Sequence, residues 1–447
     1  MVRGWVGRRR FLQLSGAGMA AAQAGGIAGI LASSQAPAYA QATTLHWLRW
    51  NDFIPSSDQL LRSKIAPQCE KDLGLKLNIE TINGNEIQAR VTSAVQSGSG
   101  PDVICALNNW PQLYADSTVD VSDIADALAK EQGGYYDTCK LVANDGKKWI
   151  AVPWCIVGAM LANRKSWFEA AGYNGTDKFP DTWENYFAAA KKMKAAGHPF
   201  GQTLGHTFGD APTFWYAYLW AMGGKEVEAD GKTVVLNSPA TVDSVKLAVS
   251  AWKPGYDEGG LAWDDSSNNR AFLSGTIAST LNGASIYIEA KRKPDTYQTE
   301  KGTPLKDDIF HHELPKGPAG QFSYHVPFSN MLMKYSKNQD AAKKFLTWIS
   351  SKPVYSQWFE SQQGFSIGAT YDWEKSKVWD EDPVMGPYRL AARSGRFAGY
   401  AGPSGQKAAE ALSKYIIVDM YAKAAQGMAP QDSVKWAHGE LVKIYQS

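Results

Sequence analysis

Cysteine is scarce in this sequence. Among 447 residues there are four, at positions 69, 105, 139 and 155. None of them has CxxC spacing, and no pair of histidines accompanies them at zinc-ligand spacing, so the sequence predicts no zinc site. Four cysteines allow three disulfide pairings, among which the sequence cannot choose, and buried free thiols are an equally good interpretation.

An excess of charge of one sign is also missing. The chain has 46 Lys and Arg against 44 Asp and Glu, a formal charge of +2. This balance argues against a general nucleic-acid-binding protein, which carries a basic excess on one domain. Hydrophobic residues at 44% and charged residues at 20% indicate a soluble globular protein rather than a disordered or collagen-like one. A chain of this length is expected to form two or more lobes.

Two common motifs of catalysis are absent, because the sequence contains no H-E-x-x-H and no Walker loop. His311 and His312 are adjacent, and neighbours in a strand point to opposite faces, so we expect a solvated or paired surface there rather than a metal site. The adjacent acids Asp264 and Asp265 leave an exported glycosidase or lyase as an enzyme alternative. We predict no catalytic residue, no metal, no cofactor and no enzymatic activity.

The first forty residues differ in chemistry from the rest. Arginines at 8–10 precede Phe-Leu, a Gly/Ala-rich run extends to about residue 32, and Ala-Tyr-Ala occupies 38–40. This order predicts an export signal peptide at 1–40, removed after Ala40. The string GRRRFLQ resembles the twin-arginine motif, although its flanking residues depart from it and leave Sec export open. The middle of the segment is too weakly apolar for a membrane span.

Removal of this segment changes the charge and leaves the tryptophans. Four of the basic residues and none of the acidic ones lie within it, so the mature chain has a charge of −2. The chain contains 17 tryptophans, an unusually high number, and one of them, Trp5, lies in the segment. The tryptophan excess therefore belongs to the mature protein.

Strand-like and helix-like segments alternate after the signal. Strands are predicted at 44–50, 75–79 and 102–107, with helices at 64–73 and 86–96 between them. This alternation predicts an α/β layer with crossover helices.

A second α/β region is expected from about Pro153. Thr182 is a predicted N-cap of a helix that ends at Gly197, and Ser238 of a helix that begins at Pro239 and runs to residue 251 or 252. Further strands are predicted at 276–281 and 326–334, a helix at 338–350, and mostly helix from 406 onward.

Several short motifs occur in the order that is typical of one family. They are SGSGPDVI at 97–104, AVPW at 151–154, FPDTWE at 179–184, FLSG at 272–275, LPKGP at 314–318 and SKNQDAAK at 336–343. Together they resemble family 1 extracellular solute-binding proteins of ABC importers, which include maltose- and other sugar-binding proteins. Leu161 and Ala162 replace a common Tyr-Tyr pair. The resemblance covers nearly the whole mature chain.

The resemblance implies an α/β, two-lobed periplasmic-binding-protein fold (type II), with a ligand cleft between lobes that are joined by hinge strands. It implies a first lobe of 42–152 plus about 324–362, and a second of 153–323 plus about 363–447. Hinge crossings are expected near 151–153, between 320 and 326, and near 363. The implied protein is an exported, periplasmic monomer that captures a sugar or oligosaccharide and delivers it to ABC permease subunits in the inner membrane. No nucleic-acid partner is expected.

Sugar chemistry suggests which residues hold the ligand. An aromatic ring covers the C–H face of a sugar, and polar side chains bond its hydroxyls from loops at the carboxyl ends of strands. Side chains in such positions are Trp50, Asn51, Asp52, Asn85, Asn108, Asn109, Trp110, Trp154, Trp215, Tyr216, Asn282, Ser285 and Tyr287. Asn83, beside Asn85, and Asp210, before the aromatic cluster, are further candidates, and Phe328, Ser329 and residues 364–366 are weaker ones. Each aromatic could instead fill a core, and each asparagine could close a turn.

A second ligand class stays open. The segment WNDFIP at 50–55 is also similar to the opening of polyamine-binding proteins, where acids and aromatic rings hold ammonium groups. A mature chain of this length and the Thr-Trp-Glu helix start favour the sugar-type branch. The expected pocket is also richer in asparagine than in carboxylates, whereas a polyamine needs net negative charge. We therefore predict a sugar, with a polyamine as the alternative.

Overall fold

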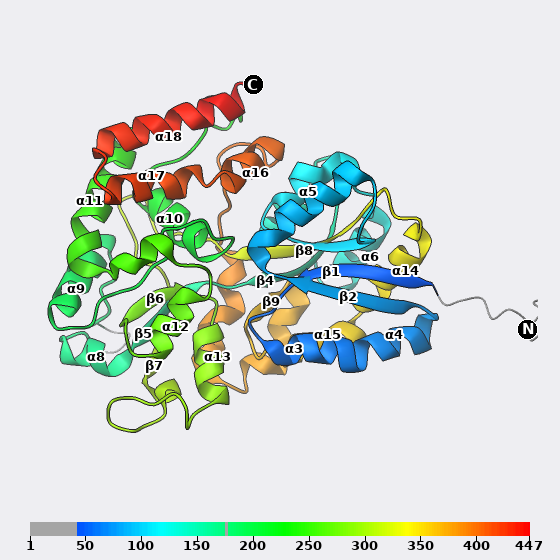
Figure 1. The fold of residues 1–447 in the computed structure, drawn as a ribbon, viewed down its shortest axis with the longest axis horizontal. Coiled ribbons are helices and arrows are strands. Elements are labelled where there is room, and N and C mark those ends of the chain that lie inside the picture. The colour runs from blue at the N-terminus through cyan, green and yellow to red at the C-terminus, as the bar shows by residue number, and fades with distance from the viewer. Residues whose placement is uncertain (1–42, 175–177) are drawn as a thin grey trace, which may run out of the picture. The chain divides into compact units, whose positions relative to one another are not determined.

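Two β-sheets form the frame of the computed structural model, which describes residues 43–174 and 178–447 (Figure 1). The predicted signal peptide lies outside the described residues. The larger sheet contains, in spatial order, β2 (Lys76–Ile82), β1 (Thr44–Trp50), β3 (Val103–Leu107), β8 (Val326–Leu332), β4 (Val152–Val157) and β9 (Ser366–Gly368). The smaller sheet contains β6 (Ser279–Asn282), β5 (Met160–Arg164) and β7 (Ile309–His312).

The larger sheet is mixed and the smaller one is antiparallel. β1 pairs in parallel with β2 and β3, whereas β8 runs antiparallel to its neighbours β3 and β4. β5 runs antiparallel to both β6 and β7. We call the larger sheet with its covering helices the first lobe, and the smaller sheet with its helices the second lobe.

The helices cover these sheets. Those associated with the larger sheet are α3 (Pro55–Leu60), the π-helical turn η1 (Leu61–Ile65), α4 (Ala66–Leu73), η2 (Gly84–Glu86), α5 (Ile87–Ser97), η3 (Trp110–Ser117), α6 (Ser122–Glu131), α7 (Asp137–Ala143), α14 (Gln339–Ile349) and α15 (Lys352–Ser361). Those that follow in the second lobe are α8 (Lys165–Ala170), α9 (Trp183–Ala195), α10 (Asp210–Ala221), α11 (Pro239–Gly255), η5 (Glu258–Ala262), α12 (Ser267–Leu273), α13 (Ser285–Arg292) and η6 (Leu305–Asp308). The C-terminal part adds η7 (Tyr371–Lys375), η8 (Lys377–Trp379), η9 (Pro383–Arg393), α16 (Gln406–Ser413), α17 (Ile416–Ala425) and α18 (Pro430–Tyr445).

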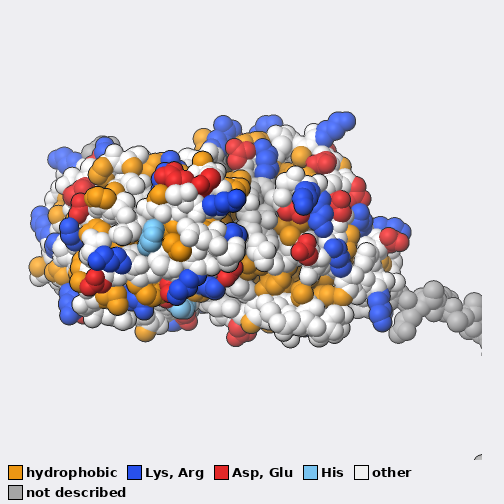
Figure 2. Space-filling model, turned by 90° about the horizontal axis from the view of Figure 1, so that it is seen from above, with side chains coloured by type: hydrophobic (Ala, Val, Ile, Leu, Met, Phe, Trp, Pro, Cys, Tyr) orange, Lys and Arg blue, Asp and Glu red, His pale blue; other side chains and the backbone are white. Residues whose placement is uncertain are grey.

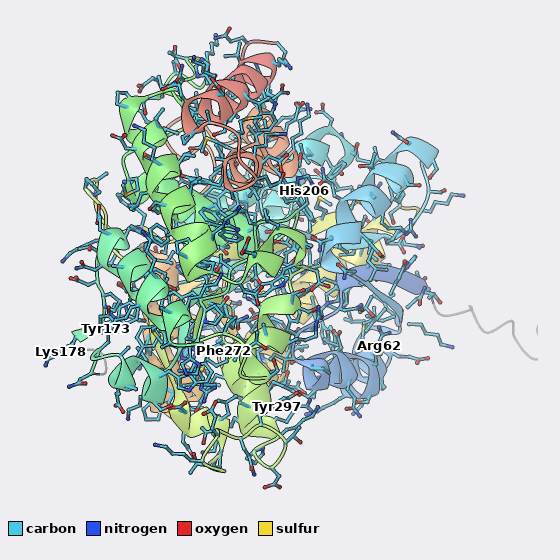
Figure 3. All side chains as sticks on the ribbon, turned by 60° about the vertical axis from the view of Figure 1, so that its left-hand side comes forward. Arg62, Tyr173, Lys178, His206, Phe272 and Tyr297 are labelled. Atoms are coloured by element: carbon cyan, nitrogen blue, oxygen red, sulfur yellow. The ribbon has the colours of Figure 1, made fainter. Side chains whose placement is uncertain are left out.

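The predicted strands of the first lobe are confirmed, but its first helix starts earlier than predicted. Helical structure begins at Pro55, at the first helical position, where proline is well tolerated. It continues through a π-helical turn to Leu73 and ends at Gly74, whose φ of 69° is left-handed. Arg62 of η1 donates to the carbonyl of Ile79 and to Thr81 Oγ1 (3.0 Å), which ties this helix to the edge strand β2 (Figure 3).

Both predicted N-caps of the second lobe are confirmed. Thr182 Oγ1 accepts a hydrogen bond from the amide of Asn185 (3.2 Å), and Ser238 Oγ accepts one from the amide of Thr241 (3.2 Å). Helix α11 begins at Pro239 as predicted but runs on to Gly255, with Pro254 inside its last turn.

Loss of the Thr182 cap is expected to destabilise the fold modestly. Thr182→Ala should lower the free energy of unfolding by about 1 kcal/mol, because one amide at the start of α9 loses its acceptor. Urea unfolding monitored by tryptophan fluorescence measures this. The matched control is Thr347→Ala, an exposed threonine inside α14, which should cause no comparable loss. Equal effects of the two substitutions would contradict the capping role.

Many tryptophans fill cores, and Trp183 is fully buried. In the first lobe, Trp154 packs on Trp358 with ring centroids 4.6 Å apart, and on Trp47 at 6.0 Å. The buried guanidinium of Arg49 lies over the Trp47 ring at 4.6 Å, and its nitrogens have no hydrogen-bond partner within the described residues. Cation–π attraction from this cluster stabilises the buried charge.

The four cysteines are free and buried, which settles the question that the sequence left open. Burial raises the pKa of the Cys69 and Cys105 thiols to about 12, so these two groups are protonated and unreactive at neutral pH.

The side chains of His311 and His312 point to opposite faces of β7, as predicted. The prediction that this place is a solvated or paired surface is wrong for His311. His311 is buried, its ring lies 5.1 Å from that of Tyr388, and burial lowers its pKa to about 4. His312 is partly exposed and stacks on Phe179 at 4.0 Å. No cluster that could hold a metal ion is found among the described residues.

The chain passes between the sheets at two clear places. It leaves β4 after Val157 and enters β5 at Met160, and it returns between His312 and Val326. The first passage lies a few residues after the expected hinge at 151–153, which falls at the start of β4 instead. The exact lobe boundaries stay a prediction.

The described surface has no membrane-spanning helix and no segregated charge on the face in view. None of the helices at 43–174 and 178–447 is long and apolar enough to cross a membrane. Figure 2 shows Lys and Arg side chains mixed with Asp and Glu side chains over both lobes on that face.

Candidate functional site

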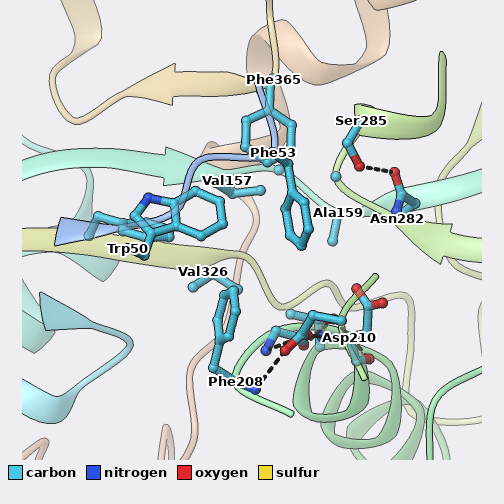
Figure 4. A pocket seen from close by; sticks show the side chains of 16 residues that line it. Trp50, Phe53, Val157, Ala159, Phe208, Asp210, Asn282, Ser285, Val326 and Phe365 are labelled. Atoms are coloured by element: carbon cyan, nitrogen blue, oxygen red, sulfur yellow. Dashed lines mark hydrogen bonds between the residues drawn. The ribbon is translucent and has the colours of Figure 1, made fainter. Parts of the chain in front are cut away.

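A cavity of about 40 Å³ lies where the two lobes meet (Figure 4). Segments from both lobes and from both passages between them contribute to it. Its lining consists of Trp50, Phe53, Val157, Gly158, Ala159, Phe208, Gly209, Asp210, Thr213, Asp265, Asn282, Gly283, Ser285, Val326, Phe328 and Phe365.

Aromatic rings grouped around Trp50 form one wall. Trp50 is the last residue of β1, and its ring centroid lies 5.3 Å from that of Phe53, 5.7 Å from Phe208, 5.0 Å from Phe328 and 6.2 Å from Phe365. We call these five residues the aromatic wall. They come from distant parts of the chain, and such a surface covers the apolar face of a ligand.

Asp265 belongs to the opposite, polar wall, and its hydrogen bonds are provided by the protein itself. Its carboxylate accepts from the amides of Phe208 (3.2 Å), Gly209 (3.1 Å) and Asp210 (2.9 Å) at the start of α10. Asn85 Nδ2 donates to it as well (3.3 Å). Burial raises its pKa to about 6, while these donors act in the opposite direction. The helix N-terminus therefore compensates much of its charge at neutral pH.

Asp210 lies next to Asp265, but its carboxylate receives none of the hydrogen bonds that Asp265 receives. Its side chain lines the cavity, and neither carboxylate oxygen has a hydrogen-bond partner within the described residues. Burial, with Asp265 and Asp264 nearby, raises the pKa of Asp210 well above its ordinary value. Asp210 is partly exposed, but its Oδ2 is buried without a donor, so a ligand can donate to this oxygen.

Asparagine and serine close the polar wall through a network of their own. Asn282 Nδ2 donates to Asn269 Oδ1 (2.6 Å), Asn269 Nδ2 donates to Ser285 Oγ (2.8 Å), and Ser285 Oγ donates to Asn282 Oδ1 (3.0 Å). Thr213 Oγ1 donates to the carbonyl of Gly209 (2.8 Å). The hydroxyl donors of Ser285 and Thr213 are therefore already used, whereas Asn282 Nδ2 engages one of its two N–H donors.

Two asparagines of the first lobe hold the backbone of Phe208 in the second. Asn85 Oδ1 accepts from the amide of Phe208 (2.8 Å), and Asn108 Nδ2 donates to its carbonyl (2.8 Å). Tyr324 Oη donates to Asn108 Oδ1 (2.8 Å), and Asn108 has a φ of 55°, which asparagine tolerates better than most residues. The Phe208 ring lies directly against Gly84. These contacts hold the lobes together across the cavity.

The cavity is too small for a sugar in this conformation. A space of about 40 Å³ holds a few water molecules, whereas ligand pockets typically measure about 300 Å³ or more. Entry of a ligand therefore requires the lobes to move apart, and the passages at 157–160 and 312–326 are where the chain can bend.

Of the thirteen residues predicted from sequence, Trp50, Asn282 and Ser285 line this cavity. Asn85 and Asn108 contact Phe208, which lines it. The remaining eight lie outside the lining. In the first lobe Asn51 is exposed, whereas Asp52, Asn109, Trp110 and Trp154 are buried. In the second lobe Trp215 and Tyr216 are buried in α10, and Tyr287 donates to Asp382 (2.9 Å). A ligand contact by any of the thirteen stays a prediction.

Several lining residues were not among the thirteen. Phe53 directly follows the candidates Asn51 and Asp52 and could have been found by extending that segment by one residue. Phe328 and Phe365 were weaker candidates. Asp265 was considered only together with Asp264, as an acidic pair. The two do not act as a pair, because Asp264 accepts from Ser267 Oγ (2.7 Å) outside the lining and only Asp265 lines the cavity. The carboxylate content also differs from expectation, because the lining has two aspartates and one asparagine.

Asp102, which belongs to the motif at 97–104, has a structural role. Its carboxylate accepts from the amide of His46 (2.8 Å) on β1 and from Ser336 Oγ (2.5 Å), so it links β1 to the segment before α14.

Asp52 lies behind the aromatic wall and connects the β1–α3 loop to the end of α15. Its Oδ2 accepts from Gln362 Nε2 (2.8 Å), and its Oδ1 accepts from the amide of Ile54 (2.8 Å). Burial, reinforced by the nearby Asp58 carboxylate, raises the pKa of Asp52 from 3.8 to about 7.

This shift predicts a pH dependence of stability. A carboxyl whose pKa is higher in the folded state stabilises the fold below its unfolded pKa, and that contribution is lost as the pH rises through about 7. The wild-type protein should therefore lose stability relative to Asp52→Asn between about pH 4 and pH 7, with little further change above that, as measured by urea unfolding. The exposed Asp137→Asn serves as control and should follow the wild type. A constant difference between wild type and Asp52→Asn would contradict the assignment.

Comparison with known proteins decides the family. The family described as bacterial extracellular solute-binding protein matches residues 64–387. The chain belongs to this family. The diacetylchitobiose-binding protein DasA of Streptomyces coelicolor is 25% identical over 213 residues, a stretch that spans 45% of this solute-binding protein and 45% of DasA.

Solved structures support the fold. Maltose-bound MalE3 of T. maritima is 19% identical, with a TM-score of 0.74 over 90% of this chain and 99% of that one. A solute-binding protein of an ABC transporter from Thermotoga lettingae TMO, bound to α-D-tagatose, is also 19% identical, with a TM-score of 0.75 over 90% and 100%. The predicted α/β, two-lobed periplasmic-binding-protein fold is confirmed.

Proposed function

We propose that this solute-binding protein captures a sugar or oligosaccharide between its lobes and delivers it to ABC permease subunits in the inner membrane. In this proposal it acts as an exported periplasmic monomer, without enzymatic activity and without a nucleic-acid partner. The observation that carries the proposal is the cavity between the lobes, with the aromatic wall on one side and Asp210 on the other.

This arrangement suits the two-sided chemistry of a sugar. The C–H face of the ring can pack on Trp50 and its neighbours, and hydroxyl groups can donate to the unpartnered Asp210 carboxylate. Closure of the lobes then removes both contacts from water, which strengthens the hydrogen bonds. The relatives support the same class, because their printed names specify diacetylchitobiose, maltose and tagatose.

The alternatives have less support. A glycosidase needs a carboxyl group that is free to donate a proton and a second to act as base or nucleophile. Asp265 is instead saturated by four donors, three of them backbone amides. None of the three relatives reported above is named for an enzymatic activity or for a polyamine.

A thermal-shift screen tests the proposal. The protein without residues 1–40 is heated with neutral mono- and disaccharides, amino sugars, polyols, putrescine and spermidine in turn. We expect at least one sugar to raise the melting temperature in a saturable way, since a ligand that binds only the folded state stabilises it. Stabilisation by putrescine or spermidine alone would contradict the sugar proposal.

A further inference from the structure

Asp210 is an unusual group for a cavity of this kind. Its carboxylate lines the cavity with no hydrogen bond from the described part of the chain, while its neighbour Asp265 receives four. Asp210 is partly exposed but its Oδ2 is buried, and a buried carboxylate oxygen without a donor is unfavourable. The missing donor is therefore expected to come from the ligand.

No positive charge of the protein compensates for this carboxylate within the cavity. The 16 lining residues include two aspartates and no lysine, arginine or histidine. The donors at the start of α10 are directed at Asp265, which leaves Asp210 without compensation. The cavity is thus electrostatically suited to a cationic group.

The hydrogen-bond inventory distinguishes an ammonium group from a hydroxyl group. A hydroxyl donates once and also accepts, so a site built for hydroxyls offers donors as well as acceptors. Here the hydroxyls of Ser285 and Thr213 and one N–H of Asn282 are already engaged with protein acceptors, so among these three side chains only the second N–H of Asn282 is left for a ligand. An ammonium group has three donors and no acceptor, so it needs only what Asp210 offers.

The aromatic wall supplies the second component of a cation site. Five rings line the same small cavity as Asp210, and one of them is Trp50, the aromatic side chain that attracts cations most strongly. Figure 4 shows Asp210 facing the cavity from one side and Trp50 and Phe53 from the other. Rings on one side and a carboxylate on the other can enclose one ammonium group.

We propose that the sugar bound by this protein carries a protonated amino group, which is held between Asp210 and the aromatic wall. The ligand class is then an amino sugar with a free amine rather than a neutral or N-acetylated sugar. This inference rests on the proposed function and deepens it. Burial raises the pKa of Asp210, and an ammonium partner would offset this shift, because it favours the ionised carboxylate that burial disfavours.

Matched sets of sugars provide the test. Calorimetric titration of the protein without residues 1–40 compares glucosamine with glucose and N-acetylglucosamine, and galactosamine with galactose and N-acetylgalactosamine. In at least one set the amino sugar should bind on the order of tenfold tighter than both partners, since it adds a charge-assisted hydrogen bond and a cation–π contact. Amino sugars that bind no tighter than their neutral partners, or not at all, would overturn the inference.

Two variants locate the effect. Asp210→Asn keeps the shape of the side chain but removes its charge, so the advantage of the amino sugar should disappear. Asp264→Asn is the matched control, because Asp264 lies next to Asp265 but bonds to Ser266 and Ser267 and does not line the cavity. It should keep the preference. An amino-sugar preference that survives Asp210→Asn would place the ammonium group elsewhere and overturn the assignment.

The two proposals fail in different ways. Tight binding of a neutral sugar with no gain from an amine leaves the proposed function intact and refutes this inference. Binding of putrescine or spermidine without any sugar refutes both, since it would show a cation site that serves a different class of solute.

Discussion

A methyl group added at Gly84 is expected to weaken ligand binding without destabilising either lobe. Gly84 precedes α5 in the first lobe, and a Cβ atom placed there would lie 2.6 Å from Cδ1 of Phe208 in the second lobe, and closer still to Cε1. The Phe208 ring is buried against Trp50, and its backbone is held by Asn85 and Asn108, so it has little room to retreat. We expect the lobes to close on this contact again once the cavity has widened to take the ligand, so the added methyl group of Gly84→Ala should oppose closure.

The expected size follows from the cost of overpacking. Inserting one methyl group into a well-packed contact costs about 1 to 3 kcal/mol, which corresponds to a loss of affinity of roughly five- to a hundredfold. Gly84 does not have a positive φ, so the substitution adds no backbone strain of its own. Calorimetric titration with the sugar that performs best in the thermal-shift screen measures the loss, and urea unfolding measures stability.

A second glycine provides the control. An added Cβ at Gly439 in α18 meets nothing within 4 Å, so Gly439→Ala should leave affinity unchanged and, as a helix-interior substitution, should not reduce stability. Wild-type affinity in Gly84→Ala would show that the ligand-bound protein does not adopt this closed contact.

Removal of the Trp50 ring is expected to have a still larger effect on binding. Trp50 is the centre of the aromatic wall, with four phenylalanines around it, and it is 4% exposed. Truncation of a central aromatic anchor typically costs about 2 to 4 kcal/mol in binding, so Trp50→Ala should lower affinity roughly thirty- to a thousandfold. Calorimetric titration with the same sugar measures it.

Packing must be separated from binding in this experiment, because Trp50 is also part of the core. Trp50→Phe retains an aromatic face and should recover most of the affinity. Trp348→Ala removes a partly buried tryptophan of α14 that donates to Asp72 (3.2 Å). Neither Trp348 nor Asp72 lines the cavity. It should lower stability and leave affinity unchanged. Equal affinity losses in Trp348→Ala and Trp50→Ala would assign the effect to general destabilisation.

The parts of the fold that depend on local sequence could be predicted. Thr182 and Ser238 were recognised as N-caps because a cap and the amide that it binds lie three residues apart. The buried strand at 102–107 was visible as a short apolar run. The start of the first helix at Pro55 was missed, because residues 55–63 are largely polar and the apolar periodicity becomes clear only later.

The site was only partly predictable because its geometry depends on distant contacts. Phe208 reaches the cavity because Asn85 and Asn108, more than a hundred residues earlier in the chain, hold its backbone. No local pattern around Phe208 signals this. A large aromatic residue near a strand end looks the same in sequence whether its ring faces a core, as for Trp154, or a cleft, as for Trp50.

The mechanism that emerges is closure over a small, two-sided cavity. Asn85 and Asn108 join the lobes through Phe208, and Phe208 in turn belongs to the aromatic wall, so the contacts that close the protein and those that meet the ligand share a residue. A ligand that donates to Asp210 stabilises the closed form relative to the open form. The size of this effect is the difference between its binding free energies for the two forms.

The most direct test is a calorimetric titration of the wild-type protein and Trp50→Ala with the same panel of neutral and amino sugars, putrescine and spermidine. We expect saturable binding of at least one sugar to the wild type, and its loss in Trp50→Ala. Heat from putrescine or spermidine alone, or sugar binding that is unchanged in Trp50→Ala, would contradict it.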